Sequence, residues 1–315
     1  MKMRKLSRAI LKLGAYYLLL TFPVAAHTEN ISHQSQSAAF SSSHFTITDE
    51  GTTQKPDIIF IPGLSEGRDI WANEALRLSS DYHLHMLQIN GFAGQKFPHN
   101  TSRFFLLPSV VKQLHNYITT RHMHPVLIGH SLGGLIALML SQQYPQDVSK
   151  IIVVDTLPFY GNLYGPQATV ENTKKIALAT RDNIVHQNPE QAKQAQKQIA
   201  QMLALSPAGQ QYVLINTQTS DPAIVAQALY EDAQTDLRPQ ILSNKVKTLV
   251  LYAYDPTLYG KTDQKTPAGD YMETIFKAGY KNMPDVTLVR IDNSRHLIMF
   301  DQPEAMHKAI EDFLR

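Results

Sequence analysis

The chain has 315 residues, of which 43% are hydrophobic and 18% are charged, so it can bury a large core and is not a disordered polymer. It contains no cysteine, which excludes disulfides, thiolate catalysis and cysteine-ligated metals. The net charge is +2, but residues 1–26 hold five basic residues and no acidic one. The rest of the chain has 24 basic and 27 acidic residues, and this balance argues against a nucleic acid partner.

The first 26 residues have the pattern of a secretory signal peptide. A basic start, Met1–Lys12, is followed by an apolar run, Leu13–Ala26, which ends with the small residues Val24 and Ala26. This run is shorter than the roughly 20 residues that a membrane-spanning helix needs. We therefore expect cleavage after Ala26, no stable membrane insertion, and an exported protein, either periplasmic or secreted.

Residues 27–44 are rich in serine, glutamine and histidine and predict a flexible tether. Beyond them, apolar strands alternate with amphipathic helices, which predicts a mainly parallel sheet flanked by helices, an α/β fold. Strands are expected at 58–61, 82–89, 125–128, 151–154, 246–252 and 286–291, and helices at 70–78, 104–117, 132–144, 271–280 and 305–314. The core of this fold is expected to consist of residues 45–164 and 241–315.

Residues 165–240 interrupt the alternation of strands and helices. This segment is rich in glutamine and alanine, favours helix, and contains no convincing strand. An all-helical insertion between two core strands predicts a cap over a site, the alternative being a helical layer unrelated to any site.

The segment 129–133 reads Gly-His-Ser-Leu-Gly, the G-x-S-x-G pattern of a nucleophile turn. An apolar strand, 126–128, runs directly into it, and an apolar helix, 135–140, runs directly out of it. A tight strand-to-helix turn pushes the hydroxyl of Ser131 above the sheet edge, and glycines are needed where side chains would collide. The N-terminus of the new helix favours negative charge developing at this position.

These features resemble the α/β-hydrolase superfamily, specifically its capped, cofactor-free serine hydrolases. The resemblance extends from about residue 57 to residue 315 and rests on four motifs: FIPGL at 60–64, GHSLGG at 129–134, VLYAYDP at 250–256 and SRH at 294–296. It implies that Ser131 is the nucleophile and that no cofactor is required.

A serine hydroxyl needs a base, and histidine is the usual choice. Of 13 histidines, His296 follows a predicted strand and precedes the last helix, which is where the superfamily carries its base. The resemblance makes Asp255, just after strand 246–252, the expected acid of the triad. Asp155, which ends strand 151–154, is the alternative that some lipases of this fold use, and Asp292 is an outside candidate. The alternative for either aspartate is a purely structural role, in which the side chain caps a helix or a turn.

The tetrahedral intermediate needs two N–H donors. We expect Leu132, directly after the nucleophile, and Leu64, in the turn after the first core strand. The superfamily often has His-Gly in that turn, where this chain has Pro62-Gly63. Proline lacks an N–H, but the expected donor lies beyond the glycine, so the substitution leaves the oxyanion hole intact.

Three aromatic residues, Phe92, Phe159 and Tyr160, are candidates for the substrate pocket, with core packing as the alternative. His83 and His85 share one face of a predicted strand, but no third ligand is evident at a matching spacing, so we expect no metal.

The sequence therefore predicts a serine hydrolase that cleaves a carboxylic ester of a small acyl-bearing molecule, lipase-like in its fold, without metal or cofactor. Amide or carbon–carbon bond cleavage on the same triad is the second reading, because specificity depends on the cap and pocket. A non-catalytic hydrolase-like binding protein is the third.

Overall fold

The computed structural model describes residues 42–315 apart from Pro166, Gln187 and residues 260–267. The expected signal peptide, 1–26, lies outside the described residues, as does the expected tether except for its last three residues. Of these three, His44 is buried, and its carbonyl accepts a hydrogen bond from the Asn90 N–H at 2.8 Å. The folded body therefore includes His44.

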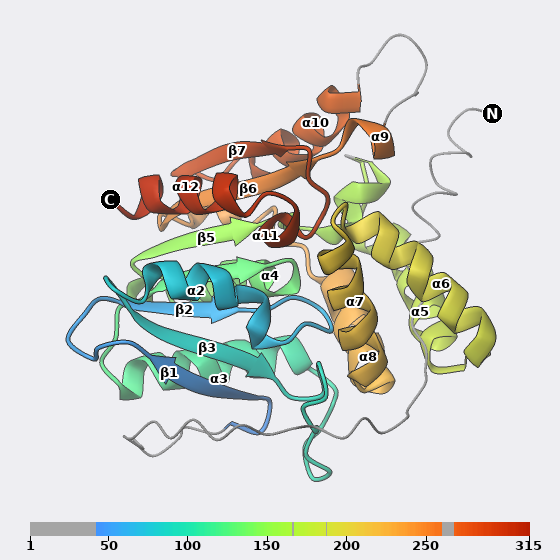
Figure 1. The fold of residues 1–315 in the computed structure, drawn as a ribbon, viewed down its shortest axis with the longest axis horizontal. Helices are drawn as coiled ribbons and strands as arrows, with labels where there is room; N and C mark the ends of the chain where they lie inside the picture. The colour runs from blue at the N-terminus through green and yellow to red at the C-terminus, as the bar shows by residue number, and fades with distance from the viewer. Residues whose placement is uncertain (1–41, 166, 187, 260–267) are drawn as a thin grey trace.

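A seven-stranded sheet in the order β1-β3-β2-β4-β5-β6-β7 forms the centre of the molecule (Figure 1). Its strands are β1 (Phe45–Glu50), β2 (Asp57–Ile61), β3 (His83–Ile89), β4 (Val126–His130), β5 (Lys150–Val154), β6 (Lys247–Tyr254) and β7 (Val286–Asp292). All neighbouring strands are parallel except β1 and β3, which pair antiparallel. The predicted fold class is confirmed, and β1 is an additional edge strand that the sequence pattern did not indicate.

Helices cover both faces of the sheet, and successive strand residues enter two separate cores. Ile59 packs in one core with α3 (Leu106–Thr120) and α4 (Leu132–Gln143), whereas its neighbours Ile58 and Phe60 pack in the other with α2 (Ala72–Leu78) and α12 (Pro303–Leu314). This is the alternation that strand geometry imposes. The core helices are α2 (Ala72–Leu78), α3 (Leu106–Thr120), α4 (Leu132–Gln143), α9 (Pro256–Tyr259), α10 (Ala268–Tyr280), α11 (Ile298–Asp301) and α12 (Pro303–Leu314), with short 3-10 helices at Arg68–Trp71, Pro145–Asp147, Tyr160–Tyr164 and Ile241–Ser243. Within the described part of the chain, no helix is both long and apolar enough to span a membrane.

Within the described residues, four α-helices between β5 and β6, which we call the cap, gather beside the carboxyl ends of the strands (Figure 1). They are α5 (Val170–His186), α6 (Pro189–Leu203), α7 (Pro207–Thr219) and α8 (Pro222–Gln234). The last three each begin with a proline that follows a capping side chain, namely Asn188, Ser206 and Asp221. Local sequence thus fixes where each of these helices starts.

The two ends of the cap segment meet where it joins the core. The Leu237 N–H donates to the Pro158 carbonyl at 2.9 Å, and Phe159 and Asp236 form an antiparallel bridge. The cap therefore leaves the core and returns to it at a single stem.

Candidate active site

Ser131 occupies the sharp turn between β4 and α4. Its backbone angles are φ 50° and ψ −120°, a strained conformation for a residue with a side chain. A Cβ on Gly133 would lie 2.2 Å from the Ile61 carbonyl oxygen, and one on Gly129 would lie 2.3 Å from the Gly133 carbonyl oxygen. The turn therefore needs both glycines, as a nucleophile elbow does.

His296 lies in the loop that joins β7 to α11. Its Nδ1 is 2.7 Å from Oδ2 of Asp155, a hydrogen-bond contact between two partly buried side chains. With Nδ1–H donating to this carboxylate, the neutral imidazole carries its lone pair on Nε2, the form that a general base requires.

The expected contact between Asp255 and His296 is not found. Asp255 instead accepts a hydrogen bond from Nε of Arg295 at 2.7 Å and one from the Thr257 N–H at 2.9 Å. The structure places the alternative acid, Asp155, on His296. Of the two predicted acids, Asp155 is therefore the one that contacts His296, and the Asp255 carboxylate is bound by the arginine next to the histidine.

Sheet order explains why Asp155 is well placed. In the β4–β5 register His130 pairs with Val154, so Ser131 and Asp155 are the next residues on adjacent strands. The Ser131 N–H donates to the Val154 carbonyl at 3.0 Å, and the second carboxylate oxygen of Asp155 accepts the Ala253 N–H at 2.8 Å. Asp155 has a positive φ of 52°, which turns it out of the strand.

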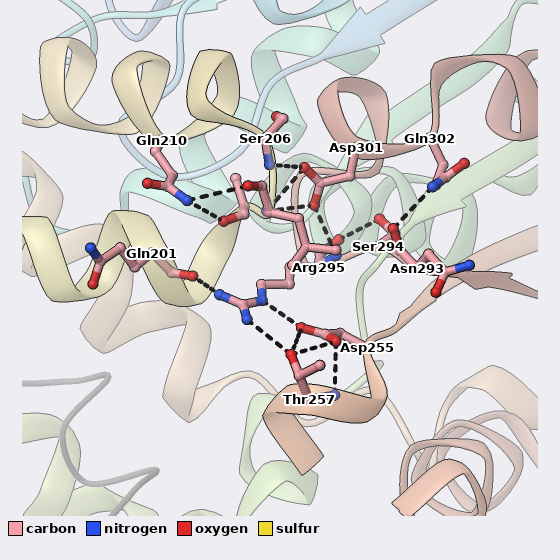
Figure 2. A network of polar contacts seen from close by, with 12 residues as sticks. Gln201, Ser206, Gln210, Asp255, Thr257, Asn293, Ser294, Arg295, Asp301 and Gln302 are labelled. Carbon is pink, nitrogen blue, oxygen red and sulfur yellow. Dashed lines mark hydrogen bonds and ion pairs between the residues drawn. The ribbon is translucent and has the colours of Figure 1, made fainter. Parts of the chain in front are cut away.

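Burial and hydrogen bonding act in opposite directions on Asp255. Burial on its own raises the pKa of this carboxyl, but the hydrogen bonds from Arg295 and Thr257 lower it more, and the net pKa lies below the ordinary value. Figure 2 shows the carboxylate between these two side chains. Asp255 is thus an ionised partner of Arg295.

The two expected oxyanion donors lie on backbone segments that touch each other. Leu64 follows the end of β2 by three residues, and Leu132 is the first residue of α4. The close approach of Gly133 to Ile61 shows that the start of α4 packs directly against the end of β2. This arrangement suits a pair of N–H donors, one from each segment.

Comparisons with known proteins identify the family of the chain. The family model described as alpha/beta hydrolase fold matches residues 56–303. The chain belongs to the α/β-hydrolase fold family. A pimeloyl-acyl-carrier-protein methyl ester esterase from Nitrosomonas europaea is 24% identical over 259 residues, which are 81% of this chain and 94% of that protein. The esterase of the same name from Aeromonas salmonicida is 28% identical over 107 residues, only 34% of this chain and 40% of that protein.

Among solved structures, MenH from S. aureus superposes on this α/β hydrolase with a TM-score of 0.69 at 17% identity. The alignment covers 87% of this chain and 98% of MenH, and at this identity it supports the fold alone.

A buried glutamate in this α/β hydrolase was missed by the sequence analysis. Glu66 accepts the Gly63 N–H at 2.5 Å and pairs with Nδ1 of His130 at 2.9 Å. The other ring nitrogen of His130 contacts the backbone carbonyl of His296 at 3.0 Å. Burial alone would lower the pKa of His130, but the Glu66 carboxylate raises it above the ordinary value. The pair thus connects the turn of the expected oxyanion hole to the loop that carries His296.

The three aromatic candidates for the substrate pocket differ in exposure. Phe92 and Phe159 have no exposed surface, so neither faces an open cleft in this conformation. The Phe159 ring packs under the Arg238 guanidinium, 4.4 Å from the ring centroid. Tyr160 is partly exposed and stacks edge-on against Tyr164. Of the three, Tyr160 is the one that solvent reaches.

A third potential metal ligand does lie beside the two strand histidines. Ligand atoms of Asp49, His83 and His85 are within 4.8 Å of one another, and sequence analysis missed Asp49 because it missed β1. In the structure the histidine nitrogens contact carboxylates instead: both rings reach Asp57 at 2.9 Å, and His85 reaches Asp49 at 3.0 Å. Because His83 begins its parallel strand whereas Ser131 follows the end of its own, this cluster lies at the opposite edge of the sheet.

Proposed function

We propose that this α/β hydrolase cleaves a carboxylic ester through an acyl-enzyme, using Ser131, His296 and Asp155. The observation that carries the proposal is the 2.7 Å contact between His296 Nδ1 and Asp155, which orients the imidazole at the sheet edge where Ser131 lies. This arrangement of serine, histidine and aspartate is the one that activates a hydroxyl near neutral pH.

In the first half of the reaction, Nε2 of His296 removes the Ser131 proton while Oγ attacks the ester carbonyl. The carbonyl oxygen gains negative charge, which the N–H groups of Leu64 and Leu132 stabilise. When the tetrahedral intermediate collapses, the carbon–oxygen bond to the alcohol breaks, and His296 protonates the leaving alkoxide. Asp155 stabilises the imidazolium throughout and stays ionised.

In the second half, water takes the place of the alcohol. His296 removes a proton from this water as it attacks the acyl-serine carbonyl, and the same N–H groups bind the second oxyanion. Ser131 leaves with the proton from His296, and the carboxylic acid is released. Every proton moves through the imidazole, so the cycle needs no metal or cofactor.

The relatives favour an ester over an amide or a carbon–carbon bond as the substrate. Two of the similar proteins are named as pimeloyl-acyl-carrier-protein methyl ester esterases, and the match to one of them extends over 94% of its length. Amide and carbon–carbon bond cleavage use the same triad and remain the alternatives, of which a matched p-nitroanilide tests the first.

The test uses purified protein and p-nitrophenyl esters of graded acyl length, together with dimethyl pimelate and a matched p-nitroanilide. We expect turnover of esters that is lost in Ser131→Ala, and labelling of the wild type but not the variant by a fluorophosphonate probe. Turnover that survives in Ser131→Ala would refute the assignment of Ser131 as the nucleophile. A folded wild type that neither turns over nor takes the probe would instead be a binding protein.

A further inference from the structure

Arg295, next to the general base, uses its whole guanidinium to join the core to the cap (Figure 2). Nε donates to Asp255 at 2.7 Å, and Nη2 donates to the Thr257 hydroxyl at 3.3 Å. Nη1 donates to the backbone carbonyl of Gln201, in the last turn of cap helix α6. The Arg295 and Asp255 side chains are 18% and 3% exposed, so solvent screens this ion pair far less than a surface pair.

The backbone beside Arg295 binds the same part of the cap, residues 201–206, which end α6 and lead into α7 and which we call the α6–α7 corner. The Leu297 N–H donates to the Leu203 carbonyl at 2.9 Å. The Asp301 carboxylate accepts the Arg295 N–H at 2.9 Å and also the N–H groups of Leu205 and Ser206 at 2.8 to 3.0 Å. His296 therefore lies between two residues, Arg295 and Leu297, that both bind the segment 201–206.

Electrostatics favours this seating of the α6–α7 corner. The guanidinium reaches a carbonyl at the C-terminus of α6, where the helix dipole is negative and carbonyls lack intrahelical partners. The Asp301 carboxylate reaches N–H groups just before α7, where the dipole is positive. The histidine loop thus presents a cation and an anion to helix ends of opposite sign, an arrangement that a generic packing contact would not need.

We propose that Arg295, held in place by Asp255, is a positioning residue that couples the seating of the α6–α7 corner to the placement of His296. The carboxylate at the position where the triad acid is expected therefore acts on the reaction indirectly, through the arginine. Movement of this corner displaces the loop at Arg295 and Leu297 and shifts the imidazole between them. This inference rests on the proposed function for its kinetic consequence, whereas the coupling itself is a property of the folded chain.

The experiment compares Arg295→Gln and Asp255→Asn with Arg315→Gln, which breaks an exposed pair with Glu311 at the C-terminal end of α12. Turnover, KM and the pH profile are measured on a short ester, and hydrogen exchange is followed in peptides covering 201–206 and 294–300. Misplacing a catalytic group by about 1 Å can cost roughly 100-fold. We expect both variants to lower kcat by about 10- to 100-fold with little change in KM, and to speed exchange in both peptides together.

The pH profile separates positioning from a simple charge effect. If the effect is one of charge alone, Arg295→Gln, which removes a cation, and Asp255→Asn, which removes an anion, should shift the acid limb of the pH profile in opposite directions. Positioning instead lowers the plateau in both variants, and the double variant is then no worse than the worse single one. If either single variant folds poorly, Thr257→Val should show the same pattern at smaller amplitude, because it removes the hydroxyl that contacts both the Asp255 carboxylate and Nη2 of Arg295.

Three results would overturn the proposal. In the first, Arg295→Gln and Asp255→Asn match the control Arg315→Gln in both exchange and kcat. In the second, exchange speeds up in only one of the two peptides. A loss of about 10,000-fold in Asp255→Asn alone would show that this aspartate is the triad acid after all. If the wild type lacks Ser131-dependent turnover, the proposed function fails, and the joint change in exchange still decides the coupling.

Discussion

Asp155 and Asp255 stand at equivalent places on neighbouring strands and have different partners. Each directly follows a parallel strand, β5 or β6, at the edge of the sheet where Ser131 lies. Asp155 contacts His296, whereas Asp255 contacts Arg295 and is almost fully buried. The comparison teaches that a carboxylate at a strand end takes its role from the groups that reach it, and that one residue along the histidine loop is enough to change that role.

The sharpest test of this comparison is the pair Asp155→Asn and Asp255→Asn. An amide at Asp155 favours the wrong tautomer of His296 and cannot stabilise the imidazolium, so we expect kcat to fall by about 10,000-fold. The same change at Asp255 should lower kcat by only about 10- to 100-fold. Steady-state kinetics on one p-nitrophenyl ester measures both, and equal losses would erase the distinction between the two aspartates.

Glu66 extends the comparison to a third carboxylate, buried and also paired with a histidine. Glu66→Gln leaves His130 without its counter-charge and loosens the Gly63 turn. Breaking a buried pair by removing one partner costs about 3–5 kcal/mol in unfolding free energy, and a displaced oxyanion donor costs up to about 100- to 1,000-fold in kcat. Urea unfolding and kinetics should show both effects, while Glu304→Gln, at an exposed pair with Arg77, should show neither.

The smallest expected effect is a pH-dependent difference in stability between wild type and Asp255→Asn. The folded pKa of Asp255 lies below the ordinary value, because the hydrogen bonds from Arg295 and Thr257 outweigh burial. Its stabilising contribution is therefore fully present above the unfolded pKa of roughly 3.9 and is lost as pH falls through the lower folded pKa.

The difference in unfolding free energy between the two proteins should accordingly be constant between about pH 5 and 7 and shrink below about pH 4. Urea unfolding across this range measures it. A difference that grows on acidification would mean that the folded pKa is raised, contrary to the role of Arg295.

Most elements of the core could be predicted from the sequence, because short stretches of sequence determine where strands and turns form. Apolar runs located the parallel strands, and the segment 129–133 located the turn at Ser131, whose glycines the backbone packing requires. The choice between Asp155 and Asp255 was not local. It depends on which strand lies next to β4 and on where the Arg295 side chain reaches, and both are set by tertiary structure.

Two other features were missed for related reasons. Glu66 lies in a polar turn, where a charged residue is ordinarily solvated, and only the fold brings His130 against it. β1 is short and its last three residues are exposed, so its pattern resembles a loop until it pairs with β3. The segment can be recognised as a strand only from its pairing with β3.

The single stem of the cap has a consequence for how such proteins can diversify. Because Pro158 and Leu237 are already hydrogen-bonded to each other, a short linker could close the chain there without moving β5 or β6. We therefore expect that the insert can be exchanged for one from another member, which would change the specificity in one recombination event. If the proposed coupling holds, a chimera keeps its catalytic rate only when the grafted cap also places the C-terminus of a helix against Arg295.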